Sequence, residues 1–488
     1  MGGGPEPAST LGSKVLSSFR WSLASTVVSR LATVLTGIAL ARILAPADFG
    51  AYAVALVGLT TILSLNDIGL AATIVRWPGD VDRIGATATT VVLGASAALY
   101  GVLFLVAPFA ADALHAPEST GVLRLLGLAV LVDGVAAVPT VVLTRSFLQD
   151  RRAVADLAGL VTGTAVTIVL ALLGEGAWSL AWGRLVGNAT VAAVVVALSP
   201  SRYRPGLSLP LARELLGFGL PLAAASMITV AIVNVDYIVV GRVLGPVALG
   251  FYVLAFNLAS WPASLALVTI RRVSLAGFAA LQHDHAALEA AFARGFALLV
   301  AVAFPISVLL AALAGPLVGL LYGSRWEPST APLRLLALAG GLRVAVELME
   351  DLLVAVGRPR TVFWIYCAWF ATLILALAVG AEAGGLSGAA WGRLVVTAAV
   401  VTPAFLWATR RAGIRAGEVL PLLRRPLVAT ALCAAVAAVL VEVVTSSNLA
   451  RLVVAGAAAT GVYALTVYPM RRLLSVSSTS PASPSSSR

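Results

Sequence analysis

The sequence predicts an all-α polytopic membrane protein with about fourteen transmembrane helices, and three observations indicate this fold class. Apolar residues make up 60% of the 488 residues and charged residues only 11%, whereas soluble domains carry about 25% charged residues. Apolar stretches long enough to cross the hydrocarbon core, about 20 residues each, recur along the chain with short connections. The two parts of the chain also repeat one another. We therefore expect two six-helix repeats related by a pseudo-twofold axis along the membrane normal, plus two extra C-terminal helices.

The internal repeat has an offset of about 200 to 210 residues. The motif LRLLGLA at 123–129 returns as LRLLALA at 333–339, and AWGRLV at 181–186 returns unchanged at 390–395. A third match joins Arg42, Leu44, Pro46, Gly50 and Tyr52 to Arg242, Leu244, Pro246, Gly250 and Tyr252. Such self-similarity indicates a duplicated unit. Because the unit is too apolar for water, the duplication predicts a transporter built from two halves around a central path.

Hydropathy places the spans and, with them, the domains. The predicted spans are 19–41, 49–70, 85–110, 121–144, 153–174, 177–198, 216–240, 248–270, 291–314, 332–355, 361–380, 386–408, 426–444 and 450–470. The predicted domains are a disordered N-terminal cytoplasmic segment (1–18), an N-lobe (19–199), a cytoplasmic linker (200–215), a C-lobe (216–410), an extra helical pair (425–470) and a disordered cytoplasmic tail (475–488). Each lobe has an even number of crossings, so both lobes insert with the same orientation.

The distribution of arginines and lysines predicts the orientation in the membrane. With the N-terminus inside, most basic residues in loops and tails face the cytoplasm, as the positive-inside rule requires. One missed or invented span would swap the sides of all later loops, so this bias supports the fourteen spans and places both termini in the cytoplasm. The net charge of +11 mostly reflects the same bias, and we expect no nucleic-acid partner.

Several ionisable residues fall inside the predicted spans, where each costs about 2.5 to 3.5 kcal/mol and needs a partner or water. Together they place charged groups at several depths between one face of the membrane and the other. Arg30, Asp133 and Arg343 lie near the midplane, Arg184, Arg393 and Asp236 in the outer part, and Asp67, Glu350 and Asp351 toward the cytoplasm, with Glu347 between. We expect a charged central cavity. Its candidate substrate-binding residues are Arg30, Asp133, Arg184, Arg343, Glu347 and Arg393, and its coupling or gating candidates are Asp67, Asp236, Glu350 and Asp351.

One pair of these charges occupies equivalent positions in the two repeats. The LRLL match places Asp133 opposite Arg343, with opposite charges. Across a cavity, the two could form a gate-like ion pair that breaks when an anionic ligand enters. A static structural bridge is an equal alternative. Arg343 and Glu347, and likewise Glu347 and Asp351, stand four residues apart and share a helix face.

The arginines of the two AWGRLV copies, Arg184 and Arg393, have two interpretations. Either they contact ligand, or they belong to fixed helix packing beside Trp182 and Trp391. Several arginines at mid-depth suit a phosphate or pyrophosphate headgroup, because guanidinium offers forked donors to phosphate oxygens. The acidic residues could instead, or as well, bind a coupling proton or sodium ion. The sequence leaves these roles open.

The repeated outer turn has a physical interpretation of its own. In both copies an arginine leaves one span, and a proline, Pro46 or Pro246, opens the next helix where its missing N–H is harmless. Gly50 and Gly250 follow. The turn could be purely structural, but its presence in both halves also suits a hinge between two moving arms.

Several classes of protein are disfavoured by what the sequence lacks. It has no phosphate-cradling GxxxxGK[ST] loop, so we expect no ATPase activity from a P-loop. Cys367 and Cys433 fall in separate spans and fit small buried residues. The three histidines predict no metal site. We therefore expect a transporter without cofactor rather than an enzyme, although an intramembrane transferase is not excluded.

Three stretches carry a family resemblance. LARILAPADFGAYAVAL followed by NDIGLAATIVR, the run VDYIVVGRVLGPVALGFYVLAF, and FPISVLLAALAGPLVGLLYGSRWEPSTAPLRLLAL resemble polysaccharide transporters of the Wzx type. These transporters belong to the multidrug/oligosaccharidyl-lipid/polysaccharide exporter superfamily. The resemblance covers roughly residues 15–410.

The resemblance implies a MATE-like fold and a flippase in the bacterial cytoplasmic membrane. Such a flippase moves a polyprenyl-pyrophosphate-linked oligosaccharide to the outer leaflet by alternating access, for lipopolysaccharide or exopolysaccharide synthesis. It implies membrane lipids, a polysaccharide polymerase and glycosyltransferases as partners, and an ion gradient as the energy source. Asp67 and Asp236 are the acidic residues of its matching stretches, and Arg30 and Arg343 would supply the cationic cavity.

Two alternatives stay open. The first is a cation-coupled multidrug or metabolite antiporter of the same superfamily, usually built from twelve spans, against which spans thirteen and fourteen argue. The second, from another class, is a glycan polymerase or ligase, or a membrane scaffold that transports nothing. A polymerase or ligase is expected to carry a large outer loop, and the predicted outer loops are short.

Overall fold

The computed structural model describes residues 32–66, 81–146, 148–200, 204–281, 284–413 and 416–468. All regular structure within these ranges is helical, as expected where hydrocarbon leaves the backbone no other hydrogen-bond partner. The predicted disordered ends, together with Arg30 and Asp67, lie outside the described residues.

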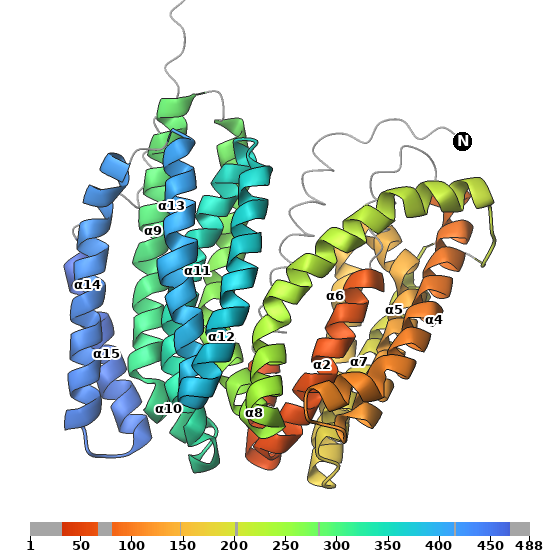
Figure 1. Cartoon of the computed structure of the whole chain (residues 1–488), viewed down its shortest axis with the longest axis horizontal. Coiled ribbons are helices and arrows are strands. Elements are labelled where there is room, and N and C mark those ends of the chain that lie inside the picture. Colours follow the sequence, from red (N-terminus) through yellow and green to blue (C-terminus); the bar gives the residue numbers. More distant parts are fainter. Residues whose placement is uncertain are drawn as a thin grey trace, which may run out of the picture. The chain divides into compact units, whose positions relative to one another are not determined.

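The helices follow one another in the order shown in Figure 1. A short stretch, Ala32–Ile43, comes first. The others are α2 (Pro46–Asn66), α4 (Val81–Ala113), α5 (Ser119–Arg145), α6 (Gln149–Leu172), α7 (Ala177–Leu198), α8 (Leu209–Ala280), α9 (His285–Ala312), α10 (Ala314–Leu321), η1 (Ser324–Ser329), α11 (Thr330–Ala355), α12 (Pro359–Val396), η2 (Thr397–Val401), α13 (Thr402–Arg411), α14 (Ala416–Val443) and α15 (Asn448–Val467).

Two long helices each contain a glycine break that divides them into two spans. In α8 the break is at Gly245, with φ 82°, and in α12 it is at Gly384 and Gly385, the latter with φ 58°. Only glycine adopts such positive φ angles at low cost. Counted this way, with Ala32–Ile43 as the described part of the first span, the described helices account for all fourteen predicted spans. The predicted fold class is confirmed.

Ten of the described helical segments are long and apolar enough to cross a membrane. Helix α11, which corresponds to the tenth predicted span, is not among them because it carries five charged residues. They are Arg334, Arg343, Glu347, Glu350 and Asp351. The most charged span is therefore one that apolar character alone would not identify.

The contacts divide the chain into two compact units, residues 1–253 and 254–488. The division falls inside α8, so the first unit includes the seventh span, which the repeat assigns to the C-lobe. Hydrogen bonds explain this attachment. Near the start of α8, the Ser208 N–H donates to Thr87 Oγ1 (3.2 Å), and at the other end of its first span Arg242 Nη1 donates to the Ala113 carbonyl (2.6 Å). The predicted lobe boundaries themselves stay a prediction.

Each unit is a helical bundle with its own set of helix–helix contacts. In unit 1, α5 packs against α2, α4 and α7, and α6 packs against α7. In unit 2, α11 packs against α9 and α12, while the extra helical pair, α14 and α15, attaches through α14 to α9. Figure 1 shows α14 and α15 side by side at the edge of this bundle. The extra pair thus belongs to the second unit.

Candidate functional site

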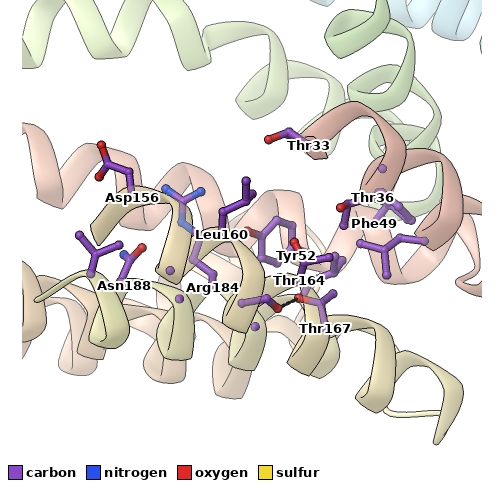
Figure 2. A pocket seen from close by; sticks show the side chains of 18 residues that line it. Thr33, Thr36, Phe49, Tyr52, Asp156, Leu160, Thr164, Thr167, Arg184 and Asn188 are labelled. Carbon is purple, nitrogen blue, oxygen red and sulfur yellow. Dashed lines mark hydrogen bonds between the residues drawn. The ribbon is translucent and has the colours of Figure 1, made fainter. Parts of the chain in front are cut away.

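A pocket of about 450 Å³ lies in unit 1, between Ala32–Ile43, α2, α6 and α7. Figure 2 shows Asp156, Arg184 and Asn188 toward one end, and Thr33, Thr36 and Phe49 toward the other. The described residues that line it are Thr33, Thr36, Gly37, Leu40, Phe49, Tyr52, Asp156, Gly159, Leu160, Gly163, Thr164, Thr167, Leu180, Gly183, Arg184, Gly187, Asn188 and Val191. Its lining combines glycine, threonine and two opposite charges.

Glycines bring α6 and α7, which both line the pocket, into close contact. A methyl group on Gly163 would lie 2.8 Å from the Gly183 carbonyl oxygen, and one on Gly187 would lie 2.9 Å from that of Gly159. Small residues four apart allow this approach between membrane helices. Gly183 belongs to the first AWGRLV copy, and in the second copy Gly392 packs in the same way against the Ala376 carbonyl. The repeated motif is thus a helix-packing motif in both units.

This packing places Arg184 beside the pocket. Its guanidinium interacts electrostatically with the hydroxyl of Tyr52, the residue that the repeat pairs with Tyr252. Asp156 lines the same pocket from α6. Asp156 also interacts electrostatically with Arg152, four residues earlier on the same helix. The pocket thus offers a guanidinium to an anionic group and a carboxylate to a cation or proton.

The charged stripe on α11 forms the second candidate site, inside unit 2. Arg343 Nε donates to Glu347 Oε1 at 2.9 Å, which realises the predicted spacing of four residues. The Arg343 guanidinium also lies 5.8 Å from the centre of the Trp369 ring on α12. Glu347 is 9% exposed and Asp351 only 6%. The carboxylates Glu347 and Asp351 of this charged stripe are thus buried inside the bundle.

One turn further along α11, Glu350 accepts a hydrogen bond from the Tyr366 hydroxyl at 2.8 Å. Tyr366 stacks at 5.5 Å on Trp369, whose indole Nε1 is buried and has no hydrogen-bond partner among the described atoms. A buried donor without an acceptor is costly. Trp369 therefore adds an unsatisfied donor next to the charged residues of α11, among the described atoms.

Two more candidates have partners of their own. Asp236 is fully buried and accepts from the Tyr252 hydroxyl at 3.0 Å. Arg393 is 5% exposed and lies 5.0 Å from the Phe256 ring centre. The two AWGRLV arginines therefore differ, because Arg184 borders a pocket while Arg393 is enclosed.

The repeated outer turns meet each other inside unit 1. A methyl group on Gly50 would fall on the Pro246 carbonyl oxygen, and one on Gly250 would collide with the Pro46 carbonyl and lie 3.1 Å from the Gly50 nitrogen. The start of α2 and the second span of α8 thus cross through two reciprocal glycine-to-carbonyl contacts. The four predicted hinge residues are in one place, and their hinge role stays a prediction.

Other predicted residues are not brought together. Asp133 is exposed on α5 in unit 1, whereas Arg343 belongs to unit 2, so their pairing stays a prediction.

Sequence reasoning missed Tyr52, Asp156, Tyr366 and Trp369. Tyr52 was visible as part of the repeated outer turn, and Asp156 as a further charge within a predicted span. Nothing in the sequence pattern singled out the other two.

Comparisons with known proteins agree with this architecture. A family model described as polysaccharide biosynthesis protein matches residues 39–331, more than half of the chain. The lipopolysaccharide biosynthesis protein WzxC of Escherichia coli K12 is 26% identical over 389 residues, covering 79% of each chain. The succinoglycan biosynthesis transport protein ExoT of Rhizobium meliloti is 28% identical over 415 residues, covering 83% of this chain and 82% of ExoT.

Solved structures share the fold. The lipid II flippase MurJ in an inward closed conformation matches with a TM-score of 0.77 at 12% identity, over 93% of this chain and 99% of MurJ. An inward-facing MATE family multidrug resistance transporter of the MOP superfamily matches with a TM-score of 0.64 at 15% identity, over 79% of this chain and 94% of the transporter.

Proposed function

The chain belongs to the family of polysaccharide biosynthesis proteins, and from this premise we propose that it is a flippase for a polyprenyl-pyrophosphate-linked oligosaccharide. It carries this substrate across the bacterial cytoplasmic membrane during the synthesis of a cell-surface polysaccharide. Family membership is the observation that carries the proposal. The fold, which it shares with solved transporters, supports a transport step.

The chemistry of the pocket in unit 1 supports an anionic substrate. Arg184 faces the pocket beside the Tyr52 hydroxyl, and the neighbouring Asn188 adds amide donors. Guanidinium and amide donors converging on one place suit the oxygens of a pyrophosphate. In this proposal Arg184 binds the charged link between lipid and glycan, while the glycan itself lies outside this pocket.

Carboxylates supply candidates for the coupling step. Asp156 opens to the same pocket, while Asp236, Glu350 and Asp351 lie within the bundles. A proton or sodium ion that binds one of them changes the local charge and favours one arrangement of the two halves over the other.

The proposal places both termini in the cytoplasm. Glycosyltransferases complete the substrate on that side, and a polymerase consumes it on the other.

Deletion in the cell that carries this chain tests the proposal. We expect loss of surface polysaccharide and accumulation of the lipid-linked oligosaccharide in the inner leaflet, where it resists externally added glycosidases. The intact chain should restore both, and Arg184→Ala should not. Arg204→Ala, in the exposed connector before α8, is the matched control and should behave like the intact chain. Unchanged surface polysaccharide after deletion would contradict the proposal.

A further inference from the structure

A second, larger pocket lies in unit 2, at the end of the bundle that the sequence predicts to be outside. Its volume is about 930 Å³, within the range of about 300 to 1,000 Å³ typical of small-molecule sites. Four parts of the chain enclose it: the α10–η1–α11 connection, the break in α12, the end of α14 and the start of α15. Its charged lining residues are Glu327, Arg334, Glu442 and Arg451, and its uncharged polar ones include Ser387 and Asn448.

The charges of this pocket balance, and most of them are not engaged. Within the described part of the chain, no hydrogen bond or ion pair holds the side chains of Glu327, Arg334 or Glu442. Arg451 donates through Nε to the Val444 carbonyl at 2.7 Å, which leaves its outer nitrogens available. The pocket thus presents two guanidinium groups and two carboxylates in one space.

Close packing surrounds two of the residues that line the pocket. Trp326, next to Glu327, is fully buried, and its ring centre lies 6.5 Å from that of buried Tyr322. Burial raises the pKa of Tyr322, so this aromatic pair stays uncharged. The Asn448 amide nitrogen lies 2.6 Å from where a methyl on Gly319 would be. The amide thus packs closely against α10 at a position where the helix has no side chain.

The repeat supplies an internal comparison. The LRLL match makes Arg124 in unit 1 the counterpart of Arg334. Arg124 is held in place, because its Nε donates to the Phe104 carbonyl at 3.2 Å and its guanidinium stacks 4.1 Å from the Phe104 ring centre. Arg334 has neither contact and instead faces the pocket. The same arginine is structural in one repeat and available for binding in the other.

The extra helical pair, α14 and α15, explains why Arg334 faces a pocket and Arg124 does not. It has no counterpart in the first repeat, and it contributes Glu442 from α14 and Asn448 and Arg451 from α15. Two of the four charged side chains that line the pocket, and one of its amides, therefore come from the helices that the duplication does not account for. The pair does not merely cover the bundle, since it completes a polar site.

We propose that this pocket is a sugar-binding site, which receives the oligosaccharide part of the substrate at the outer face. The inference rests on the proposed function. Carboxylates, guanidinium groups and an amide offer paired acceptors and donors, and adjacent sugar hydroxyls both donate and accept. A free pyrophosphate is disfavoured by the two carboxylates. A zwitterionic lipid headgroup would engage one charge of each sign and leave the remainder of so large a pocket unfilled.

Thiol protection in the intact protein tests this site. Ser387→Cys places a thiol in the pocket wall, and the parent protein measures the background from native Cys367 and Cys433. A membrane-impermeant maleimide labels the protein in right-side-out vesicles. The probes are oligosaccharides released by mild acid from the cell's own surface polysaccharide, and glycerophosphoethanolamine as a headgroup.

We expect the oligosaccharides, but not the headgroup, to slow labelling. Adding Arg334→Ala or Glu442→Gln should raise the protecting concentration at least about tenfold, as expected for loss of a charge-assisted hydrogen bond. Arg124→Ala should leave it unchanged. Protection by glycerophosphoethanolamine alone, equal protection in the Arg334→Ala protein, or no protection by either probe would each overturn the site.

Failure of the site and failure of the proposed function are distinguishable. If the protein moves lipid-linked oligosaccharide in liposomes but shows no protection, the flippase stands and the pocket is not a sugar site. If the sugars protect but no lipid-linked substrate moves, the pocket stands and the proposed flippase does not.

Discussion

The charged side chains of the second unit are stabilised by close partners. Arg343 binds Glu347 one helical turn away, and Glu350 accepts from Tyr366 on the neighbouring helix. An ionised group in the bilayer core needs such compensation. Glu347 is mostly buried, so removing Arg343 alone would leave its carboxylate without its ion-pair partner. Loss of activity in an Arg343→Ala protein would then mix a binding effect with a folding effect.

A double-mutant cycle separates these effects. We expect Arg343→Ala to lower the melting temperature more than Arg343→Ala with Glu347→Gln, because the double change removes the orphaned carboxylate. The coupling energy should be about 1 to 2 kcal/mol. Thermal unfolding of the purified proteins measures it. If Arg343 also contacts substrate, both proteins fail to transport, and additive effects on stability would show that the pair contributes nothing.

The two repeated tyrosines give a matched pair of changes. Tyr52→Phe removes the hydroxyl that interacts with Arg184 at the pocket, whereas Tyr252→Phe removes a donor from fully buried Asp236. We expect Tyr52→Phe to raise the KM for transport several-fold with little change in melting temperature. Tyr252→Phe should instead destabilise the fold by about 1 to 3 kcal/mol.

Kinetics in liposomes and thermal unfolding of both proteins check this contrast. If Tyr52→Phe lowers the melting temperature while leaving KM unchanged, Tyr52 is a packing residue and does not position Arg184.

At the scale of the helices, glycine contacts decide how closely elements approach. The α6–α7 pair and the two halves of α12 use them within repeated motifs, and α2 and α8 use them where the two outer turns cross. A helix pair in such contact has no space for a side chain. The same contacts rely on few interlocking side chains, which suits surfaces that separate and rejoin.

Gly50→Ala tests the crossing of α2 and α8. The added methyl meets the backbone of Pro246, which cannot move aside as a flexible side chain would. We expect a stability loss of about 1 to 3 kcal/mol and a pronounced drop in transport. Gly101→Ala in α4 is the matched control, because nothing lies within 4 Å of the added methyl. Its melting temperature should stay the same or rise, since alanine favours helix.

A Gly50→Ala protein as stable and active as the Gly101→Ala control would contradict the close crossing. Reduced transport at full stability would instead favour a hinge, since only the moving state would then be affected.

At the same scale, the sequence predicted local features better than distant contacts. The spans, the glycine and proline turns and the Arg343–Glu347 spacing are local patterns, since helical geometry relates residues a few positions apart. The contact of Gly50 with Pro246 joins positions about 200 residues apart, and no local pattern contains it. Tyr52 and Tyr366 become relevant only because other helices bring arginine or glutamate next to their hydroxyls.

At the scale of the whole molecule, duplication explains most of the architecture and divergence explains the sites. The resemblance to the Wzx type is confirmed by the family match and by the shared fold. The repeats place arginines at equivalent positions, yet Arg184 borders a pocket while Arg393 is enclosed, and Arg124 is held while Arg334 is available. Equivalent positions therefore have different roles, and the repeat alone could not assign them.

Transfer of substrate between leaflets tests the central claim most directly. The purified protein is reconstituted into liposomes with a fluorescent polyprenyl-pyrophosphate disaccharide in one leaflet, and its arrival in the other is followed with and without a proton or sodium gradient. We predict transfer that depends on the protein, responds to one of the two gradients, and is lost with Arg184→Ala but kept with Gly101→Ala. Absence of transfer, together with gradient-driven efflux of a cationic dye from the same liposomes, would contradict the flippase and indicate an antiporter.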